Sequence, residues 1–188
     1  FDSTKYDATY GSKGSVLYFG RLIDEKGVDI LILAASTLPE VFFRIIGDGP
    51  DMKSLEKLSN GLNLRNVEFV GPKWKDEMDM ELKTCRFVVV PSMWHENFPY
   101  VINQAFAFGK PVIGSSRGGI PELVRHGERG FIYEATDSRA LAKVIKELWL
   151  DPERVDGMGR NAKEFSDREF NDNFLYQTLE EIYLEVLS

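Results

Sequence analysis

The sequence predicts an α/β fold, a Rossmann-like parallel sheet of about six strands with helices on both faces. Two observations predict this class. Short continuous apolar runs rich in β-branched and aromatic residues recur along the chain, and segments with helical periodicity separate them. The length of 188 residues suits a single domain with one core.

The strands and helices can be placed in order. We expect strands at residues 15–19, 41–46, 67–70, 87–90, 111–114 and 130–133, each too continuous in apolar residues to be half exposed. We expect helices at residues 28–36, 52–58, 75–83, 99–108, 120–125 and 138–150. Right-handed crossovers bring the carboxyl ends of all these strands to one edge of the sheet, where ligands of such folds bind.

Two further helices, at residues 152–165 and 171–187, follow without a strand between them. The last helix carries Leu175, Leu179, Ile182 and Val186 at helical spacing. We expect this stripe to pack against the core.

The composition excludes several classes of protein. The formal net charge is −7 and no basic block occurs, so nucleic acid is not an expected partner. No apolar run approaches the roughly 20 residues of a membrane helix, and we expect a soluble domain. The one cysteine, Cys85, excludes an internal disulfide, fits a reducing compartment, and is interpreted as a core residue rather than a nucleophile.

The first 14 residues are polar, rich in Gly, Ser and Tyr, and begin with Phe1. They lack the apolar core of a signal peptide. We expect residues 1–14 to be a linker that follows another domain, and residues 15–188 to form the ligand-binding domain.

The loop after the first strand carries Gly20, Arg21 and, five residues further on, Lys26. Such a pair of cations can bracket a diphosphate, with a planar fork on one side and a mobile ammonium on the other. A solvated surface loop is the alternative. The later turns contain Gly47 and Gly49 after the second strand, and Gly71 and Lys73 after the third. They either let backbone approach a ligand or serve only as turns.

The loop after the fourth strand is the richest in candidate residues. Glu96 precedes a helix expected to start near Pro99, and the free N–H groups of a helix start attract anions. The candidate donors are Asn97, Phe98, Tyr100 and Val101. Glu96 beside them can accept hydrogen bonds from sugar hydroxyls, or it can cap the helix.

Three further polar residues, in or beyond this loop, are weaker candidates for a functional site. Gln104 lies among apolar neighbours on the same helix, where its amide needs partners from a ligand or from backbone. We interpret His95 as a surface or packing residue rather than a general base, and His126 as a neutral surface residue. No G-x-G-x-x-G follows the first strand, and no Walker A motif or metal-ligand cluster occurs, which argues against a dinucleotide oxidoreductase or an ATPase.

Six motifs occur in one order: Gly-Arg-Leu-x4-Lys-Gly, Ile-Gly-Asp-Gly-Pro, Phe-Val-Gly, Pro-Ser-x3-Glu, Gln-Ala-x-Ala-x-Gly-Lys-Pro-Val-Ile and Gly-Gly-Ile-Pro-Glu-Leu-Val. Each is ordinary, but the ordered set, from residue 15 almost to the end, resembles the carboxyl-terminal domain of family 4 retaining glycosyltransferases. That family, also called glycosyltransferase group 1, has the two-lobed GT-B fold. The resemblance therefore implies one lobe of a GT-B enzyme, with the final helices crossing back to the other lobe.

The resemblance also implies roles for individual residues. Arg21 and Lys26 would bind the donor diphosphate, Glu96 would contact the transferred sugar, and the base would lie near residues 71–73 and 47–50. Position 104 usually holds a glutamate that binds the ribose hydroxyls, whereas this chain has Gln104, which offers only one acceptor oxygen. The segment Asn97-Phe98-Pro99 also departs from a more glycine-rich pattern.

The resemblance implies hexosyl transfer from a nucleotide sugar to an acceptor hydroxyl with retention, in polysaccharide biosynthesis. No metal or other cofactor is expected, and the isolated domain is expected to be inactive. The partners would be the nucleotide sugar and a missing amino-terminal acceptor-binding domain, through which a cytoplasmic protein could reach the inner face of the membrane. Two alternatives remain: a degenerate nucleotide- or partner-binding module, in which Gln104 marks a lost site, and a lobe of a nucleotide-sugar epimerase.

Overall fold

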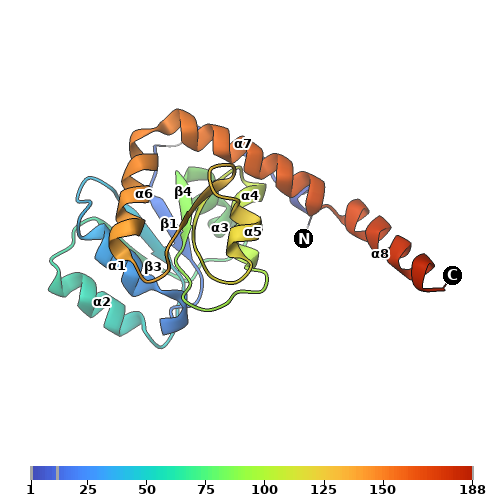
Figure 1. Ribbon diagram of the computed structural model, residues 1–188. Coiled ribbons are helices and arrows are strands. Elements are labelled where there is room, and N and C mark those ends of the chain that lie inside the picture. Colours follow the sequence, from blue (N-terminus) through green and yellow to red (C-terminus); the bar gives the residue numbers. More distant parts are fainter. Residues whose placement is uncertain (1, 12, 188) are drawn as a thin grey trace.

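The computed structural model describes residues 2–11 and 13–187, apart from the side chains of residues 173 and 175. Six parallel strands form one sheet in the order β3-β2-β1-β4-β5-β6 (Figure 1). The strands are β1 (Val16–Phe19), β2 (Phe43–Ile46), β3 (Val67–Gly71), β4 (Phe87–Val90), β5 (Val112–Ser115) and β6 (Gly130–Tyr133). The order reverses between β1 and β4, which makes their carboxyl ends the topological switch point of the sheet. The predicted α/β class is confirmed.

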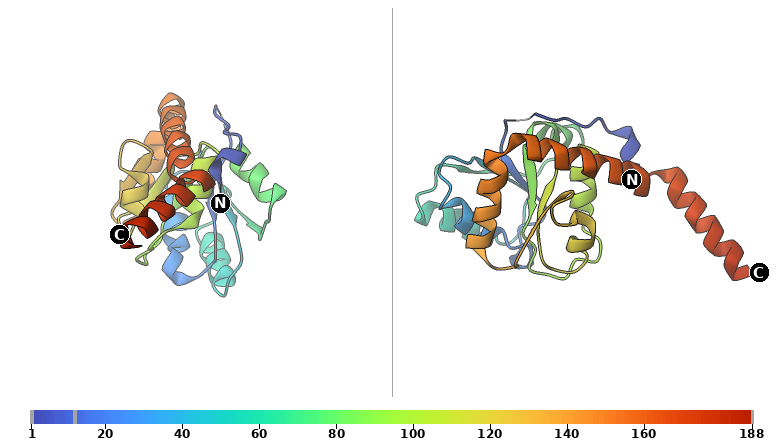
Figure 2. Two further views of the ribbon diagram at one scale, coloured as in Figure 1. Left: turned by 90° about the vertical axis from the view of Figure 1, so that its right-hand side faces the viewer. Right: turned by 45° about the horizontal axis from the view of Figure 1, so that its top comes forward.

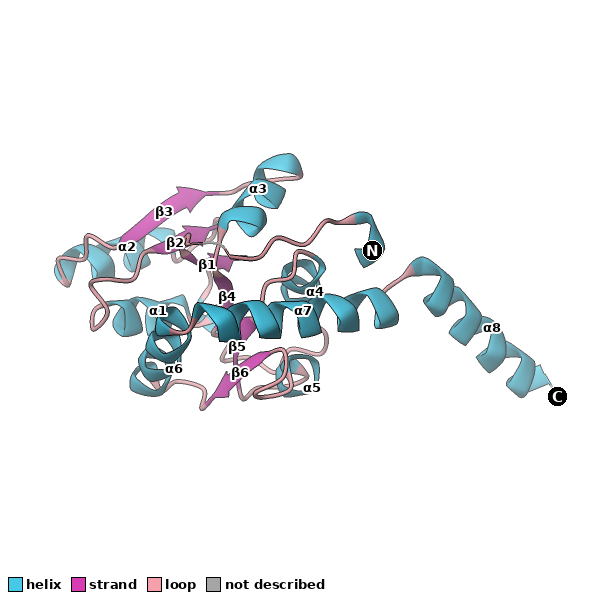
Figure 3. Ribbon diagram, turned by 90° about the horizontal axis from the view of Figure 1, so that it is seen from above, coloured by secondary structure: helices cyan, strands magenta, loops and turns pink. Residues whose placement is uncertain are grey.

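The helices form two layers, one on each face of the sheet (Figure 3). One layer holds α1 (Val28–Ala35), α2 (Met52–Gly61) and α6 (Ser138–Leu150); the other holds α3 (Asp76–Thr84), α4 (Tyr100–Ala107) and α5 (Ile120–Val124). Successive strand residues point to opposite faces, so Val16 and Tyr18 of β1 join the first core whereas Leu17 and Phe19 join the second.

The edge strand β3 departs from the expectation that every strand is fully buried. Val67 and Phe69 are only partly buried, and Glu68 is exposed. The strand pairs with β2 alone, so one of its edges and part of one face remain in solvent. A continuous apolar run therefore does not distinguish an edge strand from a central one.

Helix α7 (Pro152–Glu169) crosses between the two layers and holds the amino-terminal segment against the domain. Its residues Val155 and Met158 belong to one core and Ala162 to the other. Ser3 is fully buried beside it, where its N–H donates to the carbonyl of Phe170 at 3.0 Å and its hydroxyl to that of Ser166 at 2.8 Å. Residues 2–11, expected as a linker, thus lie on the domain surface; their connection to another domain stays a prediction.

Helix α8 (Asp172–Leu187) projects away from the rest of the molecule (Figure 2). The expected packing of its apolar stripe against the core is wrong, because Leu179 and Ile182 are each 52% exposed and Val186 is 78% exposed. The predicted contribution of Leu175 lies outside the described side chains. The predicted helix is present, but none of the described residues forms a surface that covers these exposed apolar side chains. None of the described helices combines the length and the apolar character needed to cross a membrane.

Candidate functional site

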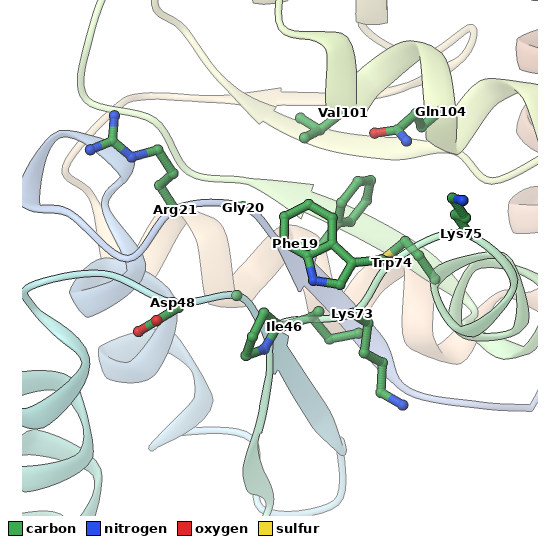
Figure 4. A pocket seen from close by; sticks show the side chains of 13 residues that line it. Phe19, Gly20, Arg21, Ile46, Asp48, Lys73, Trp74, Lys75, Val101 and Gln104 are labelled. Carbon is green, nitrogen blue, oxygen red and sulfur yellow. The ribbon is translucent and has the colours of Figure 1, made fainter.

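Two adjoining cavities open at the carboxyl ends of β1, β2 and β4. The first, of about 390 Å³, lies over β1 and β2 and is walled by the loop after β3 and by α4 (Figure 4). The second, of about 300 Å³, lies between the loops after β1 and β4. Phe19, Gly20, Arg21 and Val101 line both cavities, so these four residues form the boundary between them.

Backbone hydrogen bonds join the loops that form the floor of the first cavity. Gly20 N–H donates to the carbonyl of Ile46, and Gly47 N–H to that of Gly71, each at 3.0 Å. Gly47 has φ +141°, and a Cβ there would lie 1.8 Å from the Gly20 carbonyl oxygen. Only glycine permits this approach, so Gly47 serves the loop packing as well as the cavity lining.

An ion pair forms part of the lining of the second cavity. Lys26, from the loop after β1, contacts the Glu96 carboxylate, from the loop after β4, and both side chains are largely buried. The Ser92 hydroxyl donates to the same Glu96 oxygen at 2.8 Å. In turn, the Ser92 carbonyl accepts from the Ser115 hydroxyl at 2.5 Å, which ties this loop to the end of β5. The site therefore holds one cation and one carboxylate in fixed positions, 70 residues apart in sequence.

The backbone of the Arg21 loop is fixed by a buried tyrosine. Tyr18 lines the second cavity and donates its hydroxyl hydrogen to the Arg21 carbonyl at 2.8 Å. Burial, and secondarily the nearby negative charge of Glu96, raises the pKa of Tyr18, so the phenol stays protonated as a donor. The Arg21 guanidinium itself is solvent-exposed, at the boundary of the two cavities.

The first cavity is mostly apolar, with a few polar groups at its wall. Figure 4 shows the Trp74 indole in the middle of the lining residues, with Val101 and Gln104 on one side and Ile46 and Lys73 on the other. Within the described part of the chain, no hydrogen bond is found for the Gln104 side chain. Lys73 lines the cavity, but its ammonium lies 3.5 Å from the Glu81 carboxylate and points away from the indole.

The structure brings most of the predicted site residues to these two cavities. Ten of the 13 predicted residues line them: Gly20, Arg21, Lys26, Gly47, Lys73, Glu96, Phe98, Tyr100, Val101 and Gln104. Gly49, Gly71 and Asn97 line neither cavity. Gly49 packs against the Leu22 carbonyl and Asn97 presents its carbonyl to Gly119, so these residues shape the loops instead.

The alternative helix-capping role of Glu96 is wrong. Helix α4 begins at Tyr100 with Pro99 as its N-cap, and no side chain caps it. The Glu96 carboxylate faces Lys26 and Ser92 instead. Tyr100 and Val101 form the first turn of α4, and both residues line the second cavity.

Sequence reasoning missed Tyr18, Phe19, Ser92 and Trp74 as lining residues. Tyr18 and Phe19 end the first strand, and alternation sends them to opposite faces, so the pattern identifies them only as core. Ser92 belongs to the Pro-Ser-x3-Glu motif, which offered a signal. Trp74 follows the turn at residues 71–73, and a tryptophan in a polar loop after a strand was also a usable signal.

The remaining titratable residues considered in the sequence, two histidines and one cysteine, do not line either cavity. His95 is exposed, and the exposed His126 accepts the Ile132 N–H at its Nδ1 at 3.1 Å, as expected for a neutral ring. Cys85 is buried, and burial raises the pKa of its thiol to about 12, which fits its predicted core role. Among the described residues, no group of three His, Cys, Asp or Glu side chains could hold a metal ion; the absence of a metal requirement stays a prediction.

Comparison with known proteins gives a family match and similar structures. Residues 5–165 match the family described as glycosyl transferases group 1. An uncharacterized glycosyltransferase of Methanocaldococcus jannaschii, MJ1178, is 37% identical over 81% of this chain and 43% of its own length. The structure of Anabaena HepE in complex with UDP and glucose superposes with a TM-score of 0.88 at 27% identity, covering 98% of this chain and 55% of that chain.

The chain thus spans about half the length of these relatives. A third similar structure is the isolated carboxyl-terminal domain of a Francisella tularensis group 1 protein, LpcC. It superposes with a TM-score of 0.78 at 21% identity, covering 92% of this chain and 99% of that one. The fold of this lobe is therefore found in a chain of matching extent.

Proposed function

Since the chain belongs to the glycosyl transferases group 1 family, we propose that it binds the nucleotide-sugar donor of a retaining enzyme that transfers a hexosyl group to an acceptor hydroxyl. The observation that carries the proposal is the meeting of Lys26 and Glu96 in one cavity at the switch point of the sheet, with Arg21 at its border. A cation for phosphate and a carboxylate for hydroxyls stand side by side there. HepE, the Anabaena neighbour crystallised with UDP and glucose, supports a nucleotide-sugar ligand.

The proposed chemistry follows from charge. Breaking the anomeric C–O bond leaves negative charge on the departing nucleoside diphosphate, and fixed cations stabilise that charge. Lys26 and Arg21 supply two cations, and the amino-terminal end of α4, at Tyr100 and Val101, adds the positive end of the helix dipole. Glu96, once Lys26 turns to phosphate, accepts hydrogen bonds from hydroxyls of the transferred sugar.

The two cavities divide the donor between them. The second cavity, with Lys26 and Glu96, would take the sugar and the adjoining phosphate. The first cavity, with Gln104 at its wall, would take the nucleoside, and Arg21 at the boundary would contact the diphosphate. Among the described residues that line the second cavity, Glu96 is the one acidic side chain, which fits Glu96 as a residue that positions the sugar.

The exposed stripe of α8 supports the proposed partner lobe. The chain spans 43% and 55% of two longer relatives, so the remaining half of such a protein is available to cover Leu179, Ile182 and Val186. We place the acceptor site in that half. Cytoplasmic location, contact with a membrane through that half, and a role in polysaccharide biosynthesis belong to the same proposal.

The experiment is calorimetric titration of this domain with UDP, GDP and ADP at physiological salt. The Arg21→Ala, Lys26→Ala double variant should lose most of its affinity for the nucleotide, because the variant lacks both cations of the diphosphate site. The matched control is Arg139→Ala, Lys143→Ala, which removes the same charge from the exposed face of α6 and should bind as the wild type does.

Equal affinity of the two double variants, both shown to be folded by circular dichroism, would overturn the proposed site. A failure of every nucleotide to bind the folded wild-type domain would favour the degenerate module instead. Retention is tested on the whole protein by the anomeric configuration of its product in NMR spectra.

A further inference from the structure

Trp74 is the most exposed aromatic side chain among the described residues, at 74% of its surface. Trp74 lines the first cavity, and Figure 4 shows its ring among Phe19, Ile46 and Val101. A large apolar ring in solvent is unfavourable, because each Å² of apolar surface left in water forgoes about 25 cal/mol. Because Trp74 lines the cavity, a ligand bound there would cover its ring and recover part of this free energy.

Backbone hydrogen bonds anchor the loop that carries Trp74. The Gly71 carbonyl accepts the Gly47 N–H at 3.0 Å, and the Trp74 carbonyl accepts the Glu77 N–H at 3.2 Å. The next residue, Lys75, adopts a positive φ of +46°, which is uncommon for a residue with a side chain. These contacts position the backbone on both sides of Trp74, and the indole lines the cavity.

The surroundings of the indole suit a flat, partly apolar ring that is linked to a sugar. Phe19, Ile46, Met78 and Val101 give the cavity apolar walls. Gln104 stands at the same wall with an amide that can bond hydroxyls. The cavity continues past Arg21 toward Lys26 and Glu96, the place of the diphosphate and the sugar in the proposed function.

We infer that Trp74 stacks on the base of the bound nucleotide and supplies much of the affinity for the nucleoside. The inference rests on the proposed function and names the residue that recognises the base. It also gives a reason why a glutamine suffices at position 104: a neutral amide gives weaker bonds to ribose hydroxyls than a carboxylate, and stacking on the indole compensates for that loss. Stacking accepts any base, so Trp74 contributes affinity more than discrimination between bases.

The test compares a ligand that carries a base with one that lacks it. Calorimetry measures the affinities of UDP and of inorganic pyrophosphate for the wild-type chain, Trp74→Leu and Trp74→Phe. We expect Trp74→Leu to weaken UDP binding roughly tenfold, the range found for loss of one base–aromatic stack, and to leave pyrophosphate binding unchanged. Trp74→Phe should lie between, because phenylalanine keeps a smaller stacking face.

Trp94→Leu is the matched control. Trp94 is also exposed, at 59%, but lines neither cavity, so UDP should bind this variant as it binds the wild type. Binding should also quench tryptophan fluorescence in the wild type and in Trp94→Leu but not in Trp74→Leu.

Three outcomes count against the inference. Unchanged UDP binding by Trp74→Leu overturns stacking while leaving the proposed function in place. Equal weakening of UDP and pyrophosphate shows that Trp74 only shapes the loop, and it overturns stacking as well. Failure of the folded wild-type chain to bind either ligand overturns the proposed function together with the inference.

Discussion

Replacing Gly118 with alanine should displace the loop that carries Glu96. Gly118 lies between β5 and α5 with φ +54°, and a Cβ there would lie 2.3 Å from the Glu96 carbonyl oxygen and 2.6 Å from its nitrogen. A Cβ essentially never approaches another atom closer than 3.0 Å, so the two segments must separate by about 0.7 Å. The same displacement would lengthen and weaken the hydrogen bond that the Gly119 N–H donates to the Glu96 carbonyl at 2.7 Å.

The magnitude follows from two contributions. An L-residue in the left-handed region costs roughly 1–2 kcal/mol, and overpacking adds about 1–3 kcal/mol. We therefore expect Gly118→Ala to lower the free energy of unfolding by about 2–5 kcal/mol. Gly127 is the matched control: it has φ +85° with no atom within 4 Å of its Cβ position, so Gly127→Ala should cost only the backbone strain.

Urea denaturation measures the stability of both variants, and calorimetry with UDP-glucose measures their function. Gly118→Ala should bind UDP-glucose more weakly than Gly127→Ala does, because a shift approaching 1 Å at Glu96 disturbs the sugar contact and the Lys26 pair. Equal free energies of unfolding for the two variants would refute the close packing of the Gly118 and Glu96 loops. Equal affinities would refute the link between that packing and the site.

Three other predictions follow from the geometry. Ser92→Ala removes the 2.8 Å hydrogen bond to Glu96, so UDP-glucose binding should weaken roughly fivefold with little change for UDP; equal effects on both ligands in calorimetry would contradict the positioning role. Gln104→Glu should tighten UDP binding roughly fivefold by charge-assisted bonds to ribose hydroxyls, and an unchanged dissociation constant would place the ribose elsewhere. Burial holds the folded-state pKa of Cys85 near 12 against an ordinary value of 9.0, so rising pH ionises the unfolded thiol first and destabilises the fold. By pH 10 this costs on the order of 1 kcal/mol, and urea titrations of Cys85→Ala should lack that part of the alkaline loss; identical pH dependence would show that the thiol ionises equally in both states.

The sequence was sufficient for the sheet and for the edge that carries the site, because strand periodicity and crossover handedness fix both. The sequence could not show whether a given apolar segment is buried in the core or exposed to solvent. The runs of β3 and of α8 look like core segments, and only the three-dimensional arrangement leaves Val67 at a sheet edge and Leu179 in solvent. A periodic stripe says that a helix has one apolar face, not what covers it.

The individual residues of the candidate site could be predicted from the sequence, but the contacts between their side chains could not. Arg21, Glu96 and Gln104 follow from their places after strands or at a helix start, which depend on local sequence. The contact of Lys26 with Glu96 joins loops 70 residues apart and depends on side-chain reach. Ser92 and Trp74 needed the geometry as well, since hydroxyls and indoles are common in loops with no ligand.

The ion pair in the second cavity also determines which ligands the site prefers. Lys26 already has a counterion, so a lone phosphate must break that pair and leaves the Glu96 carboxylate facing a second anion. A molecule that presents an anion to the lysine and hydroxyl hydrogens to the carboxylate replaces both lost partners at once. The pair therefore favours a phosphorylated sugar, which replaces both lost partners, over phosphate alone, which replaces only one.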